Sequence, residues 1–158
     1  MNVQPSMPLF CTTVNDIQQQ LQPLRPFMIG QRCLGVWTAH HKETGEFWED
    51  ATMILQFEQA MIAMTANKMD ELAIEHTSID VTKVYNWCGS AELPLQYSFS
   101  PFIDTPIIEA VCILLWQGFL QGIACTHKDG YIAVVNAGDA CALRLAGIED
   151  SYTWMPGV

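Results

Sequence analysis

Hydrophobic residues along most of this chain alternate with polar ones at a period of two, which is the spacing of a half-buried β-strand. The alternation predicts strands over Gln31 to His41, Ala51 to Glu58, Met61 to Thr65 and Leu72 to Glu75. The polar turn Lys42 to Glu46 joins the first two of them as a hairpin. The first half is therefore expected to form a four-stranded meander.

Two helical interpretations belong to this half. Ala, Met, Gln and Lys favour helix, so a helix competes with the strands over Gln56 to Met69. Near the N-terminus, Thr13 to Asp16 offers capping side chains before Ile17 to Leu21, and a short helix is expected there. Pro23 and Pro26 are then expected to end it, with an extended element next.

The second half continues the strand pattern. Strands are expected over Ile107 to Trp116, Ile123 to Thr126, Tyr131 to Val135 and Cys141 to Leu145, with turns at Gly118 to Gly122, Lys128 to Gly130 and Asn136 to Asp139. Thr82 to Ser100, with Gly89, Ser90 and Pro94, is interpreted as an apolar connection between the halves. The tail after Gly147 is left open between packing its Trp154 and Met155 and staying loose.

Several features of the first half recur in the second. Pro26-Phe27 is echoed by Pro101-Phe102, and Cys33, Val36 and Trp37 by Ile108, Val111 and Cys112. Asn67-x-x-Asp70 before Leu72 and Ile74 is echoed by Asn136-x-x-Asp139 before Cys141 and Leu143. The prediction is one mainly β domain over residues 1–158, with minor α+β character and a short N-terminal helix. Two similar antiparallel β-meander halves, 26–76 and 101–146, pack as a sandwich or barrel.

Charge narrows the classes of partner. The 158 residues hold 17 Asp and Glu against 7 Lys and Arg, for a formal net charge of -10. Nucleic-acid binding depends on cations that neutralise phosphates, so such binding is not expected, and the same repulsion disfavours anionic membranes. A basic protein partner would be steered toward this surface. Acidity that only keeps an apolar-rich domain soluble is the competing interpretation.

Cysteine usage and the N-terminus indicate a reducing compartment. The six cysteines are scattered with no Cys-x-x-Cys pair: Cys11, Cys33, Cys88, Cys112, Cys125 and Cys141. Met1 to Phe10 lacks the basic start and the apolar run of a signal peptide. The longest apolar run, Val111 to Trp116, is far shorter than the roughly 20 residues of a membrane span. A cytoplasmic location is expected.

The chain carries no recognised catalytic motif, and neither enzyme activity nor a cofactor is expected. Cys125 and His127 form the one tempting nucleophile and base pair, although a buried structural thiol is the stronger interpretation. His40 and His41, adjacent on a strand, point to opposite faces, so no metal site is expected there. The carboxylate pairs Glu49-Asp50 and Asp70-Glu71 fall near turns and are interpreted as solvated loops.

The first hairpin offers the best candidate for a binding surface. It gathers four acids together with Phe47 between two tryptophans, and the candidate contact residues are Trp37, Glu43, Glu46, Trp48, Glu49 and Asp50. Charge speeds the encounter with a basic protein, and desolvated aromatics supply most of the affinity. In the competing interpretation both tryptophans belong to the core and the acids only solvate the loop.

The apolar strand, tight turn and Asn136-Ala137-Gly138-Asp139 of Ile107 to Leu145 resemble small bacterial immunity proteins that neutralise polymorphic toxins. This resemblance covers the last third of the chain and implies a non-enzymatic protein that caps a basic toxin domain by stoichiometric inhibition. Two alternatives stay open: a β-barrel or sandwich that encloses a small apolar ligand, and a structural assembly protein, including a homodimer joined through strand edges.

Overall fold

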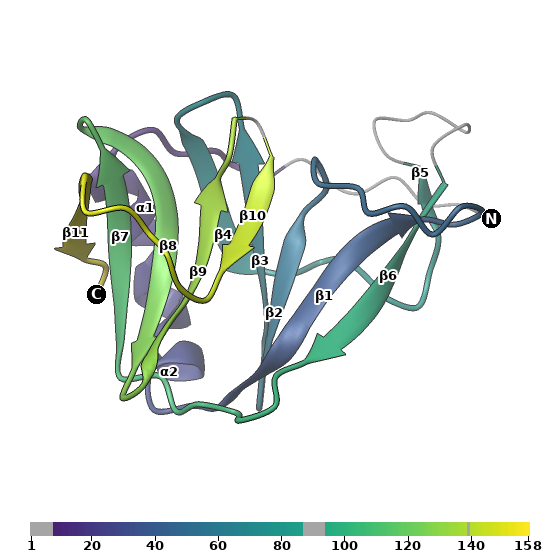
Figure 1. The fold of residues 1–158 in the computed structure, drawn as a ribbon, viewed down its shortest axis with the longest axis horizontal. Coiled ribbons are helices and arrows are strands. Elements are labelled where there is room, and N and C mark those ends of the chain that lie inside the picture. The colour runs from purple at the N-terminus through teal and green to yellow at the C-terminus, as the bar shows by residue number, and fades with distance from the viewer. Residues whose placement is uncertain (1–7, 87–93, 139) are drawn as a thin grey trace.

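The computed structural model describes residues 8–86, 94–138 and 140–158, and its strands form two antiparallel sheets (Figure 1). The first sheet contains β1 (Cys33–His41), β2 (Met53–Phe57), β3 (Met61–Asn67), β4 (Glu71–His76), β5 (Tyr85–Asn86) and β6 (Pro94–Pro101). The second contains β7 (Ala110–Trp116), β8 (Phe119–His127), β9 (Gly130–Asn136), β10 (Cys141–Arg144) and β11 (Tyr152–Pro156). The predicted mainly β fold class is confirmed.

The two sheets share one topology, except that β5 adds a sixth strand at the edge of the first. The strand order is β4-β3-β2-β1-β6-β5 in the first and β10-β9-β8-β7-β11 in the second. In each, a four-stranded meander is followed by a strand that returns to pair with the outer side of the first. The predicted pair of similar meander halves is therefore correct. Asn67 and Asn136 are both the last residue of the third strand, as their echo in the sequence indicates.

The echo at the front of the two halves does not mark equivalent positions throughout. Pro26-Phe27 lies in a helix, whereas Pro101 ends β6 and Phe102 follows it. Cys33 and Ile108 are a better match, because both are fully buried at the entrance to the first strand of their meander.

The predicted N-terminal helix is α1 (Val14–Leu21). Thr13 is its N-cap, and the Thr13 hydroxyl oxygen accepts a 3.2 Å hydrogen bond from the Asp16 backbone N–H. The helix does not end at the prolines as expected. A 3-10 turn, η1 (Gln22–Leu24), and a further helical turn, α2 (Arg25–Met28), follow it directly. Each proline stands in the first turn of its segment, where a backbone N–H has no intrahelical acceptor to lose.

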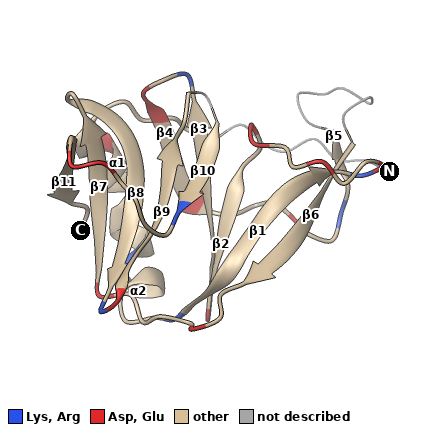
Figure 2. Ribbon diagram, viewed as in Figure 1, with Lys and Arg blue, Asp and Glu red and all other residues tan. Residues whose placement is uncertain are grey.

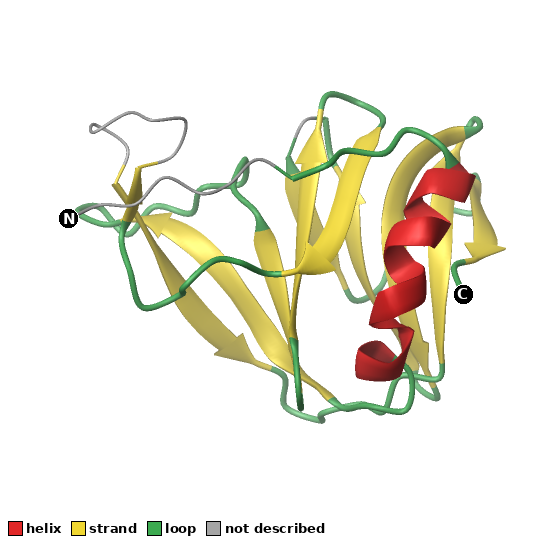
Figure 3. Ribbon diagram, turned by 180° about the vertical axis from the view of Figure 1, so that it is seen from behind, coloured by secondary structure: helices red, strands yellow, loops and turns green. Residues whose placement is uncertain are grey.

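A single core joins the helical segment to both sheets, with the helices lying across the back of the second sheet and beside β4 (Figure 3). The helices contribute Ile17, Leu21, Leu24 and Met28. The first sheet adds, among others, Leu55, Ile62 and Ile74, and the second sheet Val111, Ile113, Ile123 and Val134. Burying apolar side chains from three directions removes them from water together, which stabilises the contact between the sheets.

The second sheet is apolar on both faces. Leu114, Ala124, Ala133 and Val135 form a separate cluster on its outer face, against which Ile148 packs. The sequence interpretation of Gly118 to Gly122 as a turn is wrong except at its start. Only Gln117 and Gly118 turn, both with positive φ, and β8 begins at Phe119. Gly122 lies within β8, where a side chain would not fit because a Cβ would be 2.6 Å from the Val134 carbonyl oxygen.

The interpretation of 82–100 as a connection is also wrong in part. It includes β5 and β6, and β6 pairs with β1 from Gly35 opposite Pro101 to His41 opposite Leu95. Gly89, Ser90 and Cys88 lie outside the described residues, as does Asp139 of the β9–β10 turn. The tail packs rather than staying loose, since β11 pairs with β7. The competing helix over Gln56 to Met69 is wrong, because these residues contribute to β2 and β3.

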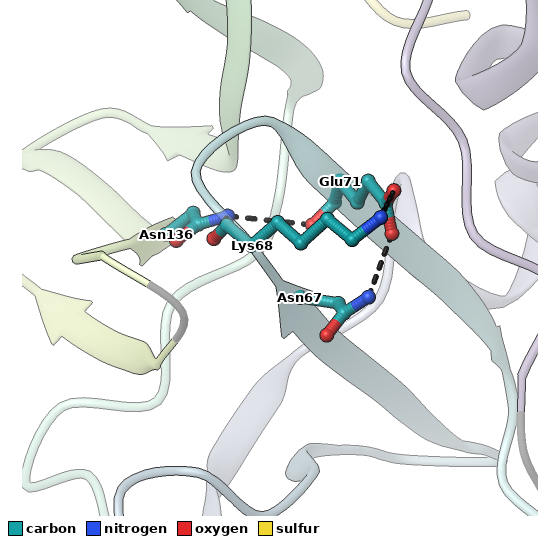
Figure 4. Close-up of polar contacts among 4 residues, drawn as sticks. All are labelled: Asn67, Lys68, Glu71 and Asn136. Atoms are coloured by element: carbon teal, nitrogen blue, oxygen red, sulfur yellow. Dashed lines mark hydrogen bonds and ion pairs between the residues drawn. The ribbon is translucent and has the colours of Figure 1, made fainter.

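Polar contacts connect the β3–β4 turn of the first sheet to the second. The Asn136 side-chain amide donates to the backbone carbonyls of Lys68 at 3.0 Å and Glu71 at 3.4 Å (Figure 4). The Gln121 amide donates to the Met69 carbonyl at 2.7 Å. Both donors are buried, so these hydrogen bonds satisfy groups that would otherwise lose their contact with water. The turn is thereby fixed against β8 and β9.

The outer edge of β4, at the end of the first sheet, is largely covered. Cys11 and Leu72 exchange two backbone hydrogen bonds of 2.7 and 3.0 Å, and the Gln20 side-chain oxygen accepts from the Ile74 N–H at 2.9 Å. Covered edges cannot template pairing with another chain. In the described part of the chain, the helices are too short to cross a membrane.

The hydrogen bonds of Asn136 generate a stability prediction. Asn136→Ala should lower the free energy of unfolding by about 2 kcal/mol, because the buried Asn136 amide donates to two backbone carbonyls of the β3–β4 turn and the variant removes this donor. Urea denaturation followed by fluorescence measures this difference. Asn67→Ala is the matched control, because among the described residues the Asn67 side-chain amide donates only to the Glu71 carboxylate of its own turn, at 2.7 Å (Figure 4). Equal losses in the two variants would contradict a special role for Asn136.

Candidate functional site

The predicted contact residues cluster in part on the connection between β1 and β2. Glu43, Glu46, Glu49 and Asp50 are all exposed there, and Figure 2 shows their acidic positions along this segment. None of the four carboxylates has an ion-pair partner among the described residues, where Lys68 and Glu71 form the one ion pair, at 3.5 Å. The hairpin therefore presents uncompensated negative charge to solvent.

Backbone hydrogen bonds hold this acidic hairpin in place. The Trp48 N–H donates to the Ala39 carbonyl at 2.9 Å, and the Lys42 N–H donates to the Pro94 carbonyl at 2.8 Å. On the other side, the N–H of Cys141 in β10 donates to the Glu49 carbonyl at 3.1 Å. The hairpin is thus tied both to its own sheet and to the second sheet. A surface fixed in advance loses little conformational entropy when it binds.

Trp48 lies at the base of the hairpin and is half-buried. It packs on a small cluster that contains Ala39, Ala51, Leu95 and Tyr97. Its indole Nε1 is buried and has no hydrogen-bond acceptor among the described residues. Such an unpaired donor costs stability, and buried indoles usually have a partner.

Trp37 lies on the same face of β1 as Ala39, two residues away along the strand. Its ring contacts Phe99 on β6 at a centroid distance of 5.0 Å, and its Nε1 donates to the Gln56 side-chain oxygen at 3.1 Å. Phe99 lies over Gly35, where a Cβ would be only 2.6 Å from the edge of the ring. Phe99 itself is 38% exposed. Trp37 and Phe99 therefore form a partly exposed aromatic pair.

The structure therefore divides the predicted residues into two groups. The four acids and Trp48 lie on or at the base of the hairpin, whereas Trp37 lies farther along β1 and contacts Phe99 instead. Sequence reasoning missed Phe99 and Tyr97, since it did not recognise β6 as a strand. The alternation of Leu95, Tyr97 and Phe99 on one face was the signal that could have revealed them. Whether this surface binds a partner remains a prediction.

The histidines take part in local hydrogen bonds. His40 Nδ1 lies 3.2 Å from the Gly45 carbonyl and His40 Nε2 lies 2.9 Å from the Thr38 hydroxyl. His41 Nδ1 accepts from the Glu43 N–H at 3.3 Å. Both rings therefore order the hairpin. Within residues 8–86, 94–138 and 140–158, no three His, Cys, Asp or Glu side chains are grouped as a metal site would require.

The pairing of Cys125 with His127 does not form a nucleophilic site. Cys125 is fully buried in the shared core, while His127 is partly exposed. Desolvation raises the pKa of Cys125 well above its ordinary value, with smaller contributions from Cys33 and Cys112. A thiol held in its protonated form is a weak nucleophile, so the structural interpretation of Cys125 is the better one.

Comparison with known protein families, curated proteins and solved structures found no match to this chain.

The buried thiols generate a prediction about pH. Desolvation raises the pKa of Cys33 to about 12 and that of Cys141 to about 11. The pKa of a thiol in an unfolded chain is about 8.5, so above that pH the unfolded chain loses protons that the native chain retains. The free energy of unfolding should then fall as pH rises from about 9 toward 11, by up to about 1.4 kcal/mol per pH unit for each such thiol.

Urea denaturation between pH 8 and 10.5 measures this slope. Cys141→Ala should make the decline shallower by the contribution of one thiol to the slope. The variant should also be less stable at pH 8, because the substitution leaves a cavity. Parallel declines in the variant and the parent protein would show that other groups cause the pH dependence.

Proposed function

We propose that this protein is a non-enzymatic binding protein for a basic protein partner, which it contacts through the acidic β1–β2 hairpin. The single observation that carries the proposal is the set of exposed, uncompensated carboxylates of Glu43, Glu46, Glu49 and Asp50 on a rigid hairpin. Lys42 is the one Lys or Arg in this segment. The local field is therefore strongly negative and would accelerate association with a positively charged surface.

Aromatic side chains beside the acids supply the second requirement of an interface. Phe47 in the hairpin is 46% exposed, and the Trp37–Phe99 pair is partly exposed on the adjoining strands. In protein interfaces, such large rings provide most of the affinity once water has been excluded around them. Charge would thus select and orient the partner, while the rings would hold it.

The proposed mechanism is occlusion by a stoichiometric complex. The hairpin is tied to both sheets, so it could occupy a cationic cleft without folding first. The resemblance of the second half to immunity proteins favours a toxin domain as the partner, with its basic substrate-binding surface as the target. Nucleic acid and anionic membranes are not proposed as partners, since they would meet the same negative field.

Charge reversal tests the proposed surface. The partner is captured from native cell lysate at low salt and purified, and its dissociation constant is then measured by calorimetry. Glu46→Lys combined with Glu49→Lys should weaken binding by about tenfold or more. Salt should also reduce the affinity of this variant less than it reduces the affinity of the parent protein. The backbone bond from Cys141 to Glu49 does not involve the Glu49 side chain, so the variant should fold.

Glu149→Lys combined with Asp150→Lys is the matched control, because both residues are exposed and lie in the β10–β11 connection. This variant reverses two carboxylates, as the hairpin variant does, without altering the hairpin. Equal weakening by this control would assign the effect to net charge rather than to the hairpin and would contradict the proposed surface.

A growth assay tests the toxin part of the proposal separately. Expression of the purified partner's gene alone should arrest growth, and co-expression of this protein should restore it. Trp48→Ala and the charge-reversed variant should fail to restore growth in proportion to their loss of affinity. If expression of the partner does not arrest growth, the protein would still be a binding protein, but the proposal that it neutralises a toxin would be rejected.

A further inference from the structure

The segment that connects the two sheets carries unusually exposed apolar side chains. Ile103 is 99% exposed and Ile107 is 47% exposed, and Leu145 at the end of β10 is 53% exposed. Grouped apolar side chains in water are unfavourable, and such groups often mark binding sites. Ile103 and Ile107 belong to the connection from β6 to β7, which runs along the lower edge of the molecule in Figure 1, away from the acidic hairpin.

A hollow of about 400 Å³ lies between this connector and the β8–β9 hairpin. Phe102 and Ile103 line it from the connector, Tyr131 and Ile132 from β9, and Leu145 from beyond β10. We refer to it as the connector pocket. Its volume is within the range of pockets that hold small organic molecules, about 300 to 1,000 Å³.

The polar groups of the connector pocket are acidic. Asp104 and Asp129 are exposed at its rim, and neither carboxylate has an ion-pair partner among the described residues. His127 also lines the pocket, and its Nδ1 accepts from the Asp129 backbone N–H at 3.3 Å. No Lys or Arg is among the lining residues. Both carboxylates of the pocket are therefore available to a cation.

The nearby cations belong to a neighbouring hollow. Arg32 and Lys128 line an adjoining cavity of about 860 Å³, and the two hollows share Ile103, Asp104, Pro106, His127 and Asp129. The Arg32 guanidinium donates to the Thr105 carbonyl at 3.1 Å, so it is bound to the backbone of the connector.

The connector is held rigidly although it is exposed. The Phe102 N–H donates to the Leu34 carbonyl at 2.9 Å, and the Cys33 N–H donates to the Pro106 carbonyl at 3.0 Å. The Ile108 N–H donates to the Gln31 carbonyl at 2.9 Å. The walls of the pocket are consequently formed before any ligand arrives, which reduces the entropic cost of binding.

We propose that the connector pocket binds a small organic cation, with an apolar or aromatic body and one ammonium group. The body would displace water from Phe102, Ile103 and Leu145, and the ammonium group would lie near Asp104 and Asp129. The rings of Phe102 and Tyr131 also suit a cation, through their negative faces. The volume matches one small molecule rather than a peptide of several residues.

Three matched probes test this assignment at constant ionic strength: 2-phenylethylamine, 2-phenylethanol and 3-phenylpropanoate. Titration calorimetry and NMR shifts of the His127 and Tyr131 rings follow their binding. The amine should bind about threefold to tenfold more tightly than the alcohol, as expected for a cation near two partly solvated carboxylates, and the carboxylate should bind least. Equal affinities of the three probes, or no binding of the amine at millimolar concentration, would overturn the proposal.

Variants locate the binding. Asp104→Asn with Asp129→Asn should reduce the amine's affinity to that of the alcohol, because both carboxylates become neutral amides. Ile103→Ser should weaken the amine and the alcohol by similar factors, and the high exposure of Ile103 makes unfolding by this change a poor explanation. Glu43→Gln with Glu46→Gln removes the same amount of charge from the acidic hairpin and should leave amine binding unchanged.

Two outcomes of this series would reject the assignment. An equal loss of amine binding in the Glu43 and Glu46 control would show a response to net charge alone. Tighter binding of an acetylated, amidated Leu-Lys-Leu peptide than of the amine would make the pocket a peptide-docking groove instead. The hairpin proposal is unaffected by either outcome, because its own variants leave the connector pocket unchanged.

Discussion

The two sheets share one core, and buried side-chain hydrogen bonds at the β3–β4 turn fix the first sheet against the second. The carbonyls of this turn at Lys68 and Met69 receive the side-chain amides of Asn136 and Gln121. With the turn held in this position, β4 and the second sheet lie close enough for the helical segment to pack against both. The hairpin and the connector occupy their places for the same reason, since both are tied to elements that this contact positions.

Local patterns in the sequence predicted the meanders well, because each of their strands pairs with its neighbour in the chain. The asparagine at the end of the third strand marks equivalent positions in both halves. β6 was missed because its pairing with β1 is distant in sequence and its other face carries Gln96, Ser98 and Ser100, which resemble a loop. Proline was misjudged near α1, since its effect depends on whether it stands in the first turn or the interior of a helix.

The candidate site was predictable to a similar extent. Exposed acids in the first hairpin follow from a local turn, and the structure places all four in solvent. The surroundings of Trp37 and Trp48 depend on β6, so Phe99 and Tyr97 could not be assigned to them without the pairing of β1 with β6. The connector pocket combines residues from three distant segments, which no local pattern brings together.

The return of β6 to β1 and of β11 to β7 also shapes how the chain folds. Hairpins within each meander close short loops and form quickly, whereas the returning strands must close long ones, and such contacts form slowly. In that interval the outer edge of β7, the most apolar strand, is unpaired and open to pairing with another copy. The negative net charge repels copies from one another, so it opposes such pairing.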